Sequence, residues 1–342
     1  MNTVIDLNTI WFFLVGLLFA GYAILDGFDL GIGALHLLSK NDRERRTLLN
    51  AIGPVWDGNE VWLVTGGGAL FAAFPEVYAT AFSGFYMAFI LLLFMLIFRA
   101  VAIDFRSKQP MRWWRNWWDF SFSLSSILTS LLIGVALGNI AMGIPLNEQH
   151  EFVGSFRSLL NPYALLIGVT TVALFMMHGS IYGMLKTEGD LHDRIQTWSK
   201  KAVVFFVLVY AVSTLATLLF LPHMSMQIRN NPIFLALPIL NVLAIINLQW
   251  QIKRGRDFQA FLSSCAVMLC LLAIFGLGIY PNMILSTPQI ENTLTIYNAA
   301  SSGKTLRIML VIAIMGIPLV LAYTASIYWI FRGKVKLDAN SY

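Results

Sequence analysis

Long apolar runs constrain this chain more than any other feature of its sequence. Nine such runs, each close to or above the roughly 20 residues that a helix needs to cross a bilayer core, alternate with short polar breaks. Transmembrane β-strands are only about half this length, so the runs predict helices. The predicted spans are 8–38, 47–74, 79–106, 117–140, 162–186, 201–221, 232–252, 257–280 and 304–331. We therefore predict an all-α polytopic membrane protein in which residues 1–342 form a single integral membrane domain.

The composition supports this prediction. Hydrophobic residues make up 58% of the 342 residues and charged residues 12%, whereas a soluble domain is about 25% charged. These values exclude a soluble enzyme and a disordered protein. The net charge of +5 is explained by membrane orientation, so no nucleic-acid partner is expected. Two cysteines predict neither a disulfide framework nor a cysteine-rich metal site.

Lysine and arginine are distributed unevenly between the two sides of the predicted membrane. Most of the 23 basic residues follow the first, third, fifth and seventh spans or lie in the C-terminal tail. Because basic loops stay in the cytoplasm, the N-terminus is predicted outside and the C-terminus inside. An odd number of spans agrees with this orientation.

A faint internal repeat divides the spans. When Leu14-Val15-Gly16 is aligned with Leu166-Ile167-Gly168, Asp26-Gly27 falls on His178-Gly179. The alignment predicts two parallel four-helix bundles, at about 8–140 and about 162–280, plus one extra helix at about 304–331. Chance matching between apolar segments is the alternative explanation.

Four carboxylates are predicted inside the first two spans, where ionisable side chains are costly and commonly functional. Asp26 and Asp29 share one helix face, and so do Asp57 and Glu60, because each pair is three residues apart. At 1.5 Å per residue, all four lie roughly 13–20 Å below the inner ends of their helices. Four carboxylates at one depth cannot all be ionised at modest cost, so some should be protonated near neutral pH. Such a group suits a proton relay.

Two other acids and one arginine bear on this interpretation. Asp104 and Asp119 lie near the inner ends of the third and fourth spans, where a path to the cytoplasm could open. The alternative is that the acids are structural and that Arg99, within the third span, neutralises one of them. The later spans contain no comparable carboxylate, so any proton chemistry is expected in the first half.

Histidine spacing argues against a haem in this chain. A transmembrane haem needs axial His or Met ligands on facing helices. Of the five histidines only His178 lies well inside a span, and no second histidine matches its depth. We therefore predict that His178 is a hydrogen-bonded packing residue and that this chain holds neither a cofactor nor a metal ion.

Two motifs show that the chain resembles subunit II of the cytochrome bd family of quinol oxidases. Segment 53–63, Gly-Pro-Val-Trp-Asp-Gly-Asn-Glu-Val-Trp-Leu, is the more specific one, and Gly27-Phe28-Asp29-Leu30-Gly31 accompanies it on the first span. Phe98-Arg99-Ala100 with Phe105-Arg106, and Tyr280-Pro281-Asn282, add to the resemblance. It covers the whole length of the chain.

The resemblance implies a complex of the bacterial plasma membrane that oxidises a quinol and reduces O₂ to water with protons from the cytoplasm. It implies that a partner, subunit I, holds two haem b groups and one haem d. Subunit II would share the fold of subunit I, two four-helix bundles plus one helix, but bind no haem. It would offer a hydrophobic groove to a quinone or a lipid. A small single-helix subunit is also implied.

The resemblance also carries roles onto individual residues. In relatives the tryptophan-flanked acidic segment lies against subunit I on a proton route. The resemblance implies this role first for Asp57 and Trp62, and then for Glu60. An acid of the Leu25-Asp26-Gly27 segment is implicated similarly. Asp29 and Asp119 are added here because of their depth. The predicted proton path therefore comprises Asp57, Glu60, Trp62, Asp26, Asp29 and Asp119.

Two other functional classes remain open. A proton-coupled secondary transporter would also use paired intramembrane acids and a repeat, although transporters more often have inverted repeats and a polar substrate site. An inert scaffold subunit would need the acids only for packing. Copurification with a haem-rich partner would argue against the transporter, and carboxylate variants would separate a scaffold from a proton path.

Overall fold

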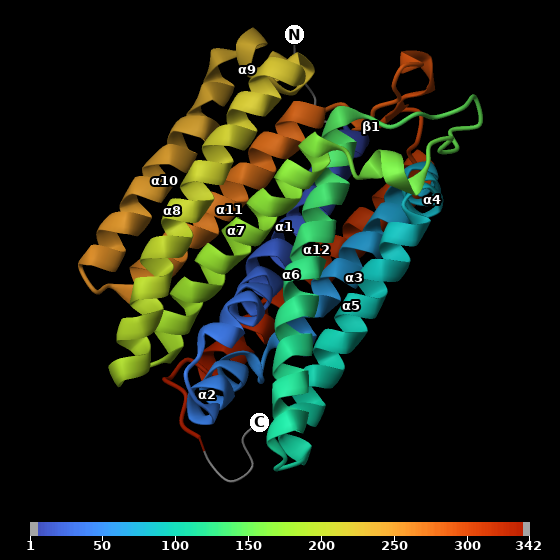
Figure 1. Cartoon of the computed structure of the whole chain (residues 1–342). Coiled ribbons are helices and arrows are strands. Elements are labelled where there is room, and N and C mark those ends of the chain that lie inside the picture. Colours follow the sequence, from blue (N-terminus) through green and yellow to red (C-terminus); the bar gives the residue numbers. More distant parts are fainter. Residues whose placement is uncertain (1–5, 338–342) are drawn as a thin grey trace.

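The computed structural model describes residues 6–337, which form long helices running side by side with a short strand pair at one end (Figure 1). The α-helices are α1 (Leu7–Leu35), α2 (Asp42–Ile52), α3 (Trp56–Ala73), α4 (Pro75–Gly84), α5 (Tyr86–Phe105), α6 (Arg112–Met142), α7 (Pro162–Lys186), α8 (Gly189–Phe220), α9 (Met226–Asn230), α10 (Ala236–Lys253), α11 (Asp257–Ile279) and α12 (Gly303–Ile330). Short 3₁₀ helices cover His36–Leu38, Arg106–Lys108, Phe156–Leu159, Pro222–Ser225, Pro232–Leu235 and Ile290–Asn292. Strands β1 (Asn282–Ile284) and β2 (Leu294–Thr295) pair antiparallel.

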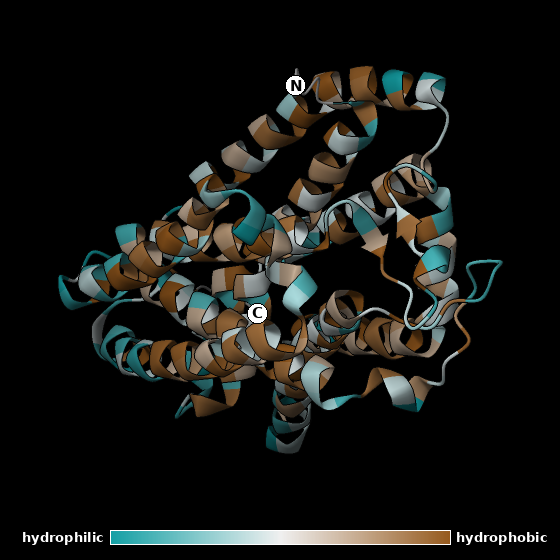
Figure 2. Cartoon of the chain, turned by 90° about the horizontal axis from the view of Figure 1, so that it is seen from above, coloured by the Kyte–Doolittle hydropathy of each residue, from teal (hydrophilic) through white to brown (hydrophobic). Residues whose placement is uncertain are grey.

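The predicted all-helical, multi-pass character is confirmed. Within residues 6–337, eight helices are long and apolar enough to cross a membrane. Hydrophobic residues cover most of the helices, and hydrophilic residues gather in loops and at helix ends (Figure 2). Helix α3, the counterpart of the predicted second span, is not among the eight. It carries Asp57, Glu60 and the Gly66-Gly67-Gly68 run, which lower its apolar character.

Two predicted continuous helices are wrong, because each is interrupted. The span predicted at 47–74 contains the end of α2 at Ile52 and the start of α3 at Trp56. Pro54 lies between them, and proline lacks the backbone N–H that a continuing helix needs. The span predicted at 79–106 is divided at Phe85, where α4 ends and α5 begins.

Helix α1 occupies the centre of the molecule and contacts α3, α6, α7, α11 and α12. Its crossing with α7 is unusually close. A Cβ atom on Gly31 would collide with the α7 backbone at Gly179, and a Cβ on Gly179 would collide with the α1 backbone. Glycine at both positions therefore allows the two backbones to touch, as small residues do in membrane helix pairs.

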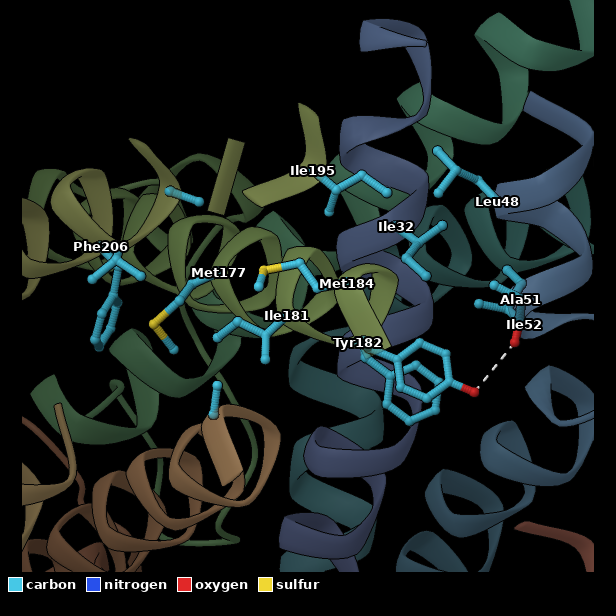
Figure 3. Close-up of a cluster of buried hydrophobic side chains, with 14 of the residues drawn as sticks. Ile32, Leu48, Ala51, Ile52, Met177, Ile181, Tyr182, Met184, Ile195 and Phe206 are labelled. Atoms are coloured by element: carbon cyan, nitrogen blue, oxygen red, sulfur yellow. Dashed lines mark hydrogen bonds between the residues drawn. The ribbon is translucent and has the colours of Figure 1, made fainter. Parts of the chain in front are cut away.

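A buried cluster joins α1, α2, α7 and α8 (Figure 3). The rings of Phe28 and Tyr182 stack with centroids 3.8 Å apart. The Tyr182 hydroxyl donates a hydrogen bond of 3.2 Å to the carbonyl of Ala51, near the end of α2. The short helix α2 is thus anchored to the long helices, and it carries its charged residues beneath them.

Helix α12 packs loosely on its own chain but is held at both ends. In its most apolar window no residue is buried. Before its first turn, the backbone N–H of Ser301 donates to the carbonyl of Ala73, at 2.8 Å. Beyond its last turn, Lys334 Nζ donates to the carbonyl of Met184, at 3.0 Å. One long apolar helix therefore remains exposed along most of its length.

Candidate functional site

Arg99 of α5 lies at the centre of a buried group of carboxylates from α1 and α3. Its guanidinium makes two hydrogen bonds to Asp26, of 2.5 and 3.1 Å, and one to Glu60, of 2.8 Å. Its Nη2 lies 3.9 Å from Oδ2 of Asp29. The side chains of Arg99, Asp26 and Asp29 are fully buried, whereas that of Glu60 is 24% exposed. One guanidinium thus faces three carboxyl groups, and Glu60 connects them to the surface.

Asp29 is held by a neutral partner. The amide nitrogen of Asn59 donates to Oδ2 of Asp29, at 2.7 Å, and to the carbonyl of Leu25, at 3.1 Å. The hydroxyl of Tyr328, on α12, donates to the amide oxygen of Asn59, at 2.9 Å. A chain of hydrogen bonds therefore links the exposed helix α12, through α3, to the carboxylate on α1.

Asp57 and Trp62 lie outside this buried group. Asp57 is exposed in the first turn of α3 and forms no hydrogen bond or ion pair within the described part of the chain. Trp62 turns toward α1, where its ring lies against Gly21 and would collide with any Cβ there. The structure thus brings together three of the four predicted carboxylates and leaves Asp57 on the outer face of α3.

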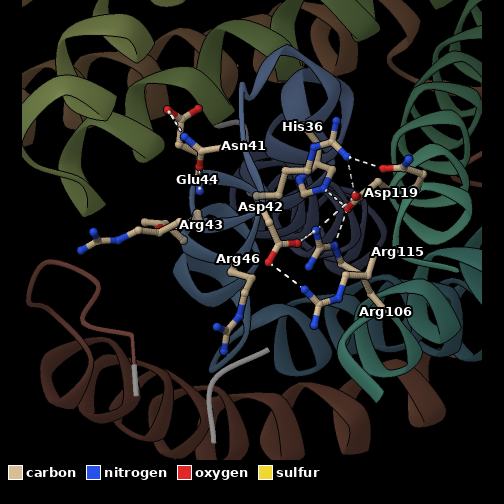
Figure 4. Close-up of polar contacts among 12 residues, drawn as sticks. His36, Asn41, Asp42, Arg43, Glu44, Arg46, Arg106, Arg115 and Asp119 are labelled. Carbon is tan, nitrogen blue, oxygen red and sulfur yellow. Dashed lines mark hydrogen bonds and ion pairs between the residues drawn. The ribbon is translucent and has the colours of Figure 1, made fainter. Parts of the chain in front are cut away.

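A second polar cluster lies at the end of the helices where α2 is found (Figure 4). Asp119 of α6 is its centre. Its Oδ1 lies 2.6 Å from His36 Nε2 and 2.5 Å from Arg106 Nε. Its Oδ2 accepts hydrogen bonds of 2.8 Å from Arg45 and 3.1 Å from Arg106. Arg106 Nη2 also donates a hydrogen bond of 2.8 Å to Oδ1 of Asp42.

Asp119, predicted near the inner end of its span, is shielded from solvent within the described residues. Its side chain is fully buried, and both of its oxygens are bonded to cationic or imidazole groups. These partners come from the end of α1, from α2 and from the end of α5, so Asp119 joins four segments of the chain. Asp104, the other acid expected near this end, is exposed.

His178 has the hydrogen-bonded packing role predicted for it. Its Nδ1 lies 2.8 Å from the Ser264 hydroxyl and its Nε2 2.9 Å from the carbonyl of Ile24. A haem ligand needs one ring nitrogen for the iron, and both are engaged here. The buried His36 is likewise bonded to Asp119 through Nε2. His178 therefore does not fit a haem ligand, whereas Nδ1 of His36 has no hydrogen-bond partner within residues 6–337. The prediction that the chain binds no haem stays a prediction.

Several residues of both clusters escaped the sequence analysis. Asn59 lies inside the specific segment 53–63, next to Glu60, so its position in the sequence could have indicated that it belongs to the polar cluster. His36 continues the α1 stripe of Asp26, which was a weaker one. Arg45 resembles an ordinary basic residue of an inner loop, whereas Arg106 was named only as part of the Phe105-Arg106 motif. Tyr328 carries no signal, because tyrosines are common near the ends of membrane helices.

Comparisons with known proteins agree over nearly the whole chain. The family described as "Cytochrome bd terminal oxidase subunit II" matches residues 7–331. "Cytochrome bd-I ubiquinol oxidase subunit 2" of Escherichia coli strain K12 is 37% identical, over 97% of this chain and 96% of its own length. "Cytochrome bd ubiquinol oxidase subunit 2" of Bacillus subtilis is 34% identical, over 97% of each.

A solved structure shows the same fold. A chain of the bd oxidase from Geobacillus thermodenitrificans superposes with a TM-score of 0.80 at 17% identity, covering 95% of this chain and 98% of that one. At that identity the likeness speaks for the fold alone. The family match and the two relatives decide the classification: this chain belongs to the family of cytochrome bd terminal oxidase subunit II.

Proposed function

We propose that this chain is the non-haem subunit of a membrane quinol:O₂ oxidoreductase, in which it supports the haem-bearing subunit I and supplies part of a proton-uptake path from the cytoplasm. Family membership carries the first part of the proposal. The Arg99 cluster carries the second, because it places three carboxylates in contact inside the helices with one of them partly exposed. The eight apolar helices agree with a multi-pass protein of the bacterial plasma membrane.

For the topology we propose nine crossings, with the N-terminus outside and the C-terminus inside. The ninth crossing is α3, which lies beside α1 and α5 in Figure 1 although its charges exclude it from the apolar set. In support, α2, the α10–α11 turn and the end of α12 lie at the same end of the molecule (Figure 1), and these segments are rich in basic residues.

We also propose two four-helix bundles plus one helix. Helix α1 contacts α3, and α5 contacts α6. In the second half α7 contacts α8, and α10 contacts α11. The first helices of the two halves, α1 and α7, contact each other as well, which suits a two-fold arrangement. Helix α12 then stands outside both bundles.

The surface for subunit I is proposed on α3, α5 and α12. These helices lie on one side of the molecule (Figure 1) and expose large apolar side chains there: Val61, Val64 and Phe71 of α3, Phe94 and Phe98 of α5, and Ile312, Met315 and Leu319 of α12. Asp57 is exposed on α3. A lipid-facing carboxylate is costly, so a protein partner with polar groups is the better cover for it.

The proposed proton path crosses this surface. Asp57 and the partly exposed Glu60 would exchange protons with subunit I, and Asp26 and Asp29 would share them inside the chain. The excess of carboxyl groups over the single guanidinium of Arg99 favours a proton held among them. Trp62 would close the path on the α1 side by its contact with Gly21.

Asp119 takes part differently in this proposal. It would hold His36 in place at the inner end of α1 rather than exchange protons with bulk water, because its own oxygens are occupied. His36 lies seven positions beyond Asp29, about 10 Å along the helix. An imidazole at that place could pass protons between the cytoplasm and the carboxylates.

The remaining partners are proposed from the family alone. The two haem b groups and the haem d would belong to subunit I, and they supply the redox chemistry. A quinone or lipid in a hydrophobic groove and a small single-helix subunit complete the proposed complex.

A scaffold role is the second candidate, and one observation favours it. Asp26, Glu60 and Asp119 are all ion-paired to arginines, as purely structural acids would be. The deciding experiment is O₂ uptake with a soluble quinol, measured beside the haem content of the purified complex, in carboxylate variants. Slow turnover at full haem content supports the proton path, whereas full turnover in every variant leaves only the scaffold.

A further inference from the structure

A polar groove lies between α10 and α11, at the edge of the molecule farthest from α3 and α5 (Figure 1). It has a volume of about 350 Å³. Its lining residues are Ala244, Asn247, Gln251, Gln259, Leu262, Ser263 and Ala266. It starts at the basic turn between the two helices and continues about two helical turns into the apolar region. Amide and hydroxyl groups at this depth are costly on a surface that faces lipid, unless they have partners.

The polar side chains of the groove form a hydrogen-bonded chain with one open end. Gln251 donates to the amide oxygen of Asn247, at 2.9 Å, and Asn247 donates to the hydroxyl of Ser263, at 2.8 Å. Ser263 in turn donates to the carbonyl of Gln259, at 2.8 Å. Gln251 is only 8% exposed, and its buried amide oxygen has no hydrogen-bond partner within residues 6–337. The wall of the groove therefore contains one buried, unsatisfied acceptor, which needs a hydrogen-bond donor.

The mouth of the groove is positively charged and aromatic. Lys253, Arg254 and Arg256 are exposed in the turn between α10 and α11. The guanidinium of Arg254 stacks 3.9 Å above the ring of Trp250, which is 51% exposed. Arg256 reaches back to the side chain of Gln259, at 3.4 Å. This arrangement of tryptophan and basic residues is suited to the headgroup level of a bilayer.

We propose that this groove binds one phospholipid whose headgroup carries both a net negative charge and hydroxyl groups, as phosphatidylglycerol does. The phosphate would pair with Arg256 and Lys253 at the mouth, and a headgroup hydroxyl would donate to the free amide oxygen of Gln251. The acyl chains would lie along the exposed apolar side chains Ile246 and Leu262. The orientation proposed above places this lipid in the cytoplasmic leaflet.

The choice of lipid follows from the two halves of the site. A zwitterionic lipid without donors, such as phosphatidylcholine, satisfies neither the net positive charge of the mouth nor the acceptor of Gln251. An anionic lipid without headgroup hydroxyls, such as phosphatidylmethanol, satisfies the charge alone. Comparing these three lipids therefore separates the electrostatic part of binding from the hydrogen-bonded part.

The test is lipid binding to the assembled, purified complex, followed by native mass spectrometry with the three lipids at equal acyl-chain length. Phosphatidylglycerol should bind about fivefold more tightly than phosphatidylmethanol because of one added hydrogen bond. Gln251→Leu should abolish that difference. Lys253→Gln together with Arg256→Gln should weaken both anionic lipids by about fivefold or more for each charge removed. Arg112→Gln, which removes one exposed charge at the start of α6, should leave binding at the groove unchanged.

Three results would overturn the proposal. The first is equal binding of all three lipids by the unaltered complex, as expected if the groove holds only water. The second is a preference for phosphatidylglycerol that survives Gln251→Leu, provided that the variant complex assembles normally. If that variant does not assemble, the surface variant Lys253→Gln/Arg256→Gln still decides the electrostatic part. The third is a protein helix seated on α10 and α11 in the purified complex.

Discussion

Arg99 of α5 grips both oxygens of Asp26 of α1, with hydrogen bonds of 2.5 and 3.1 Å, at a point where neither side chain has any exposed surface. This bidentate pair joins two helices that are distant in sequence. It also fixes the place where Glu60 of α3 approaches, 2.8 Å from the same guanidinium. The pair therefore lies at the centre of the buried carboxylate cluster formed by Asp26, Asp29 and Glu60.

Replacing Arg99 with methionine should impair folding and assembly. The change keeps an unbranched chain but leaves Asp26 buried without a counter-ion. Removing one partner of a buried pair costs about 3–5 kcal/mol. The melting temperature and the yield of the purified complex measure this loss. Arg112→Met, an exposed arginine of α6, is the matched control, and equal stability of the two variants would contradict the assignment.

Replacing Asp57 with asparagine should slow O₂ reduction and leave the haem spectra intact. Asparagine has nearly the same size but cannot exchange a proton. Within residues 6–337 the Asp57 side chain forms no hydrogen bond or ion pair whose loss would unfold the chain. Loss of a proton-transfer group should reduce turnover by about tenfold or more. O₂ uptake measured beside haem content is the readout.

The outcome at Asp57 separates two roles. Full turnover with normal haem content would refute the relay role. Loss of haem or of subunit I would instead favour a role in holding the subunits together. Glu76→Gln, at an exposed carboxylate of α4, controls for a change of surface charge.

Asp119→Asn should destabilise the chain more than a typical surface change does. The neutral amide would leave Arg45, Arg106 and His36 around a site without its negative charge, at a cost of about 3–5 kcal/mol for a broken buried pair. Thermal unfolding of the complex, or protease sensitivity of the loop before α2, would report it. Asp104→Asn is the control, because Asp104 is exposed at the same end. Indistinguishable melting of the two variants would show that the cluster does not hold the helices together.

The folded chain without its partners should bind no haem. Both ring nitrogens of His178 are engaged, by Ser264 and by the Ile24 carbonyl. An absorption spectrum of the isolated subunit, beside that of the complex, tests this. A stoichiometric Soret band that disappears in His178→Ala would contradict the prediction.

The sequence alone determined the class of the protein and the region of its polar site. The apolar runs are long enough to cross a bilayer as helices. In lipid every backbone N–H and C=O group must be hydrogen-bonded within the protein, and a helix achieves this within its own segment. Segment 53–63 identified the family before any contact was known. The acids Asp26, Asp29 and Glu60 could also be found from the sequence, because a charged residue within an apolar run is recognisable without any knowledge of its contacts.

Only the tertiary structure decided which of these groups meet. Depth along a helix can be counted, but rotation about its axis is set by packing, such as the contact of Gly31 with Gly179. Asp57 and Glu60 both lie on α3. The rotation of α3 and the helices packed against it bring Glu60 to Arg99 and leave Asp57 exposed. They also bury Asp119 among Arg45, Arg106 and His36, which come from three other segments. A sequence records where charges lie along the chain, whereas their partners depend on side-chain directions that only packed helices define.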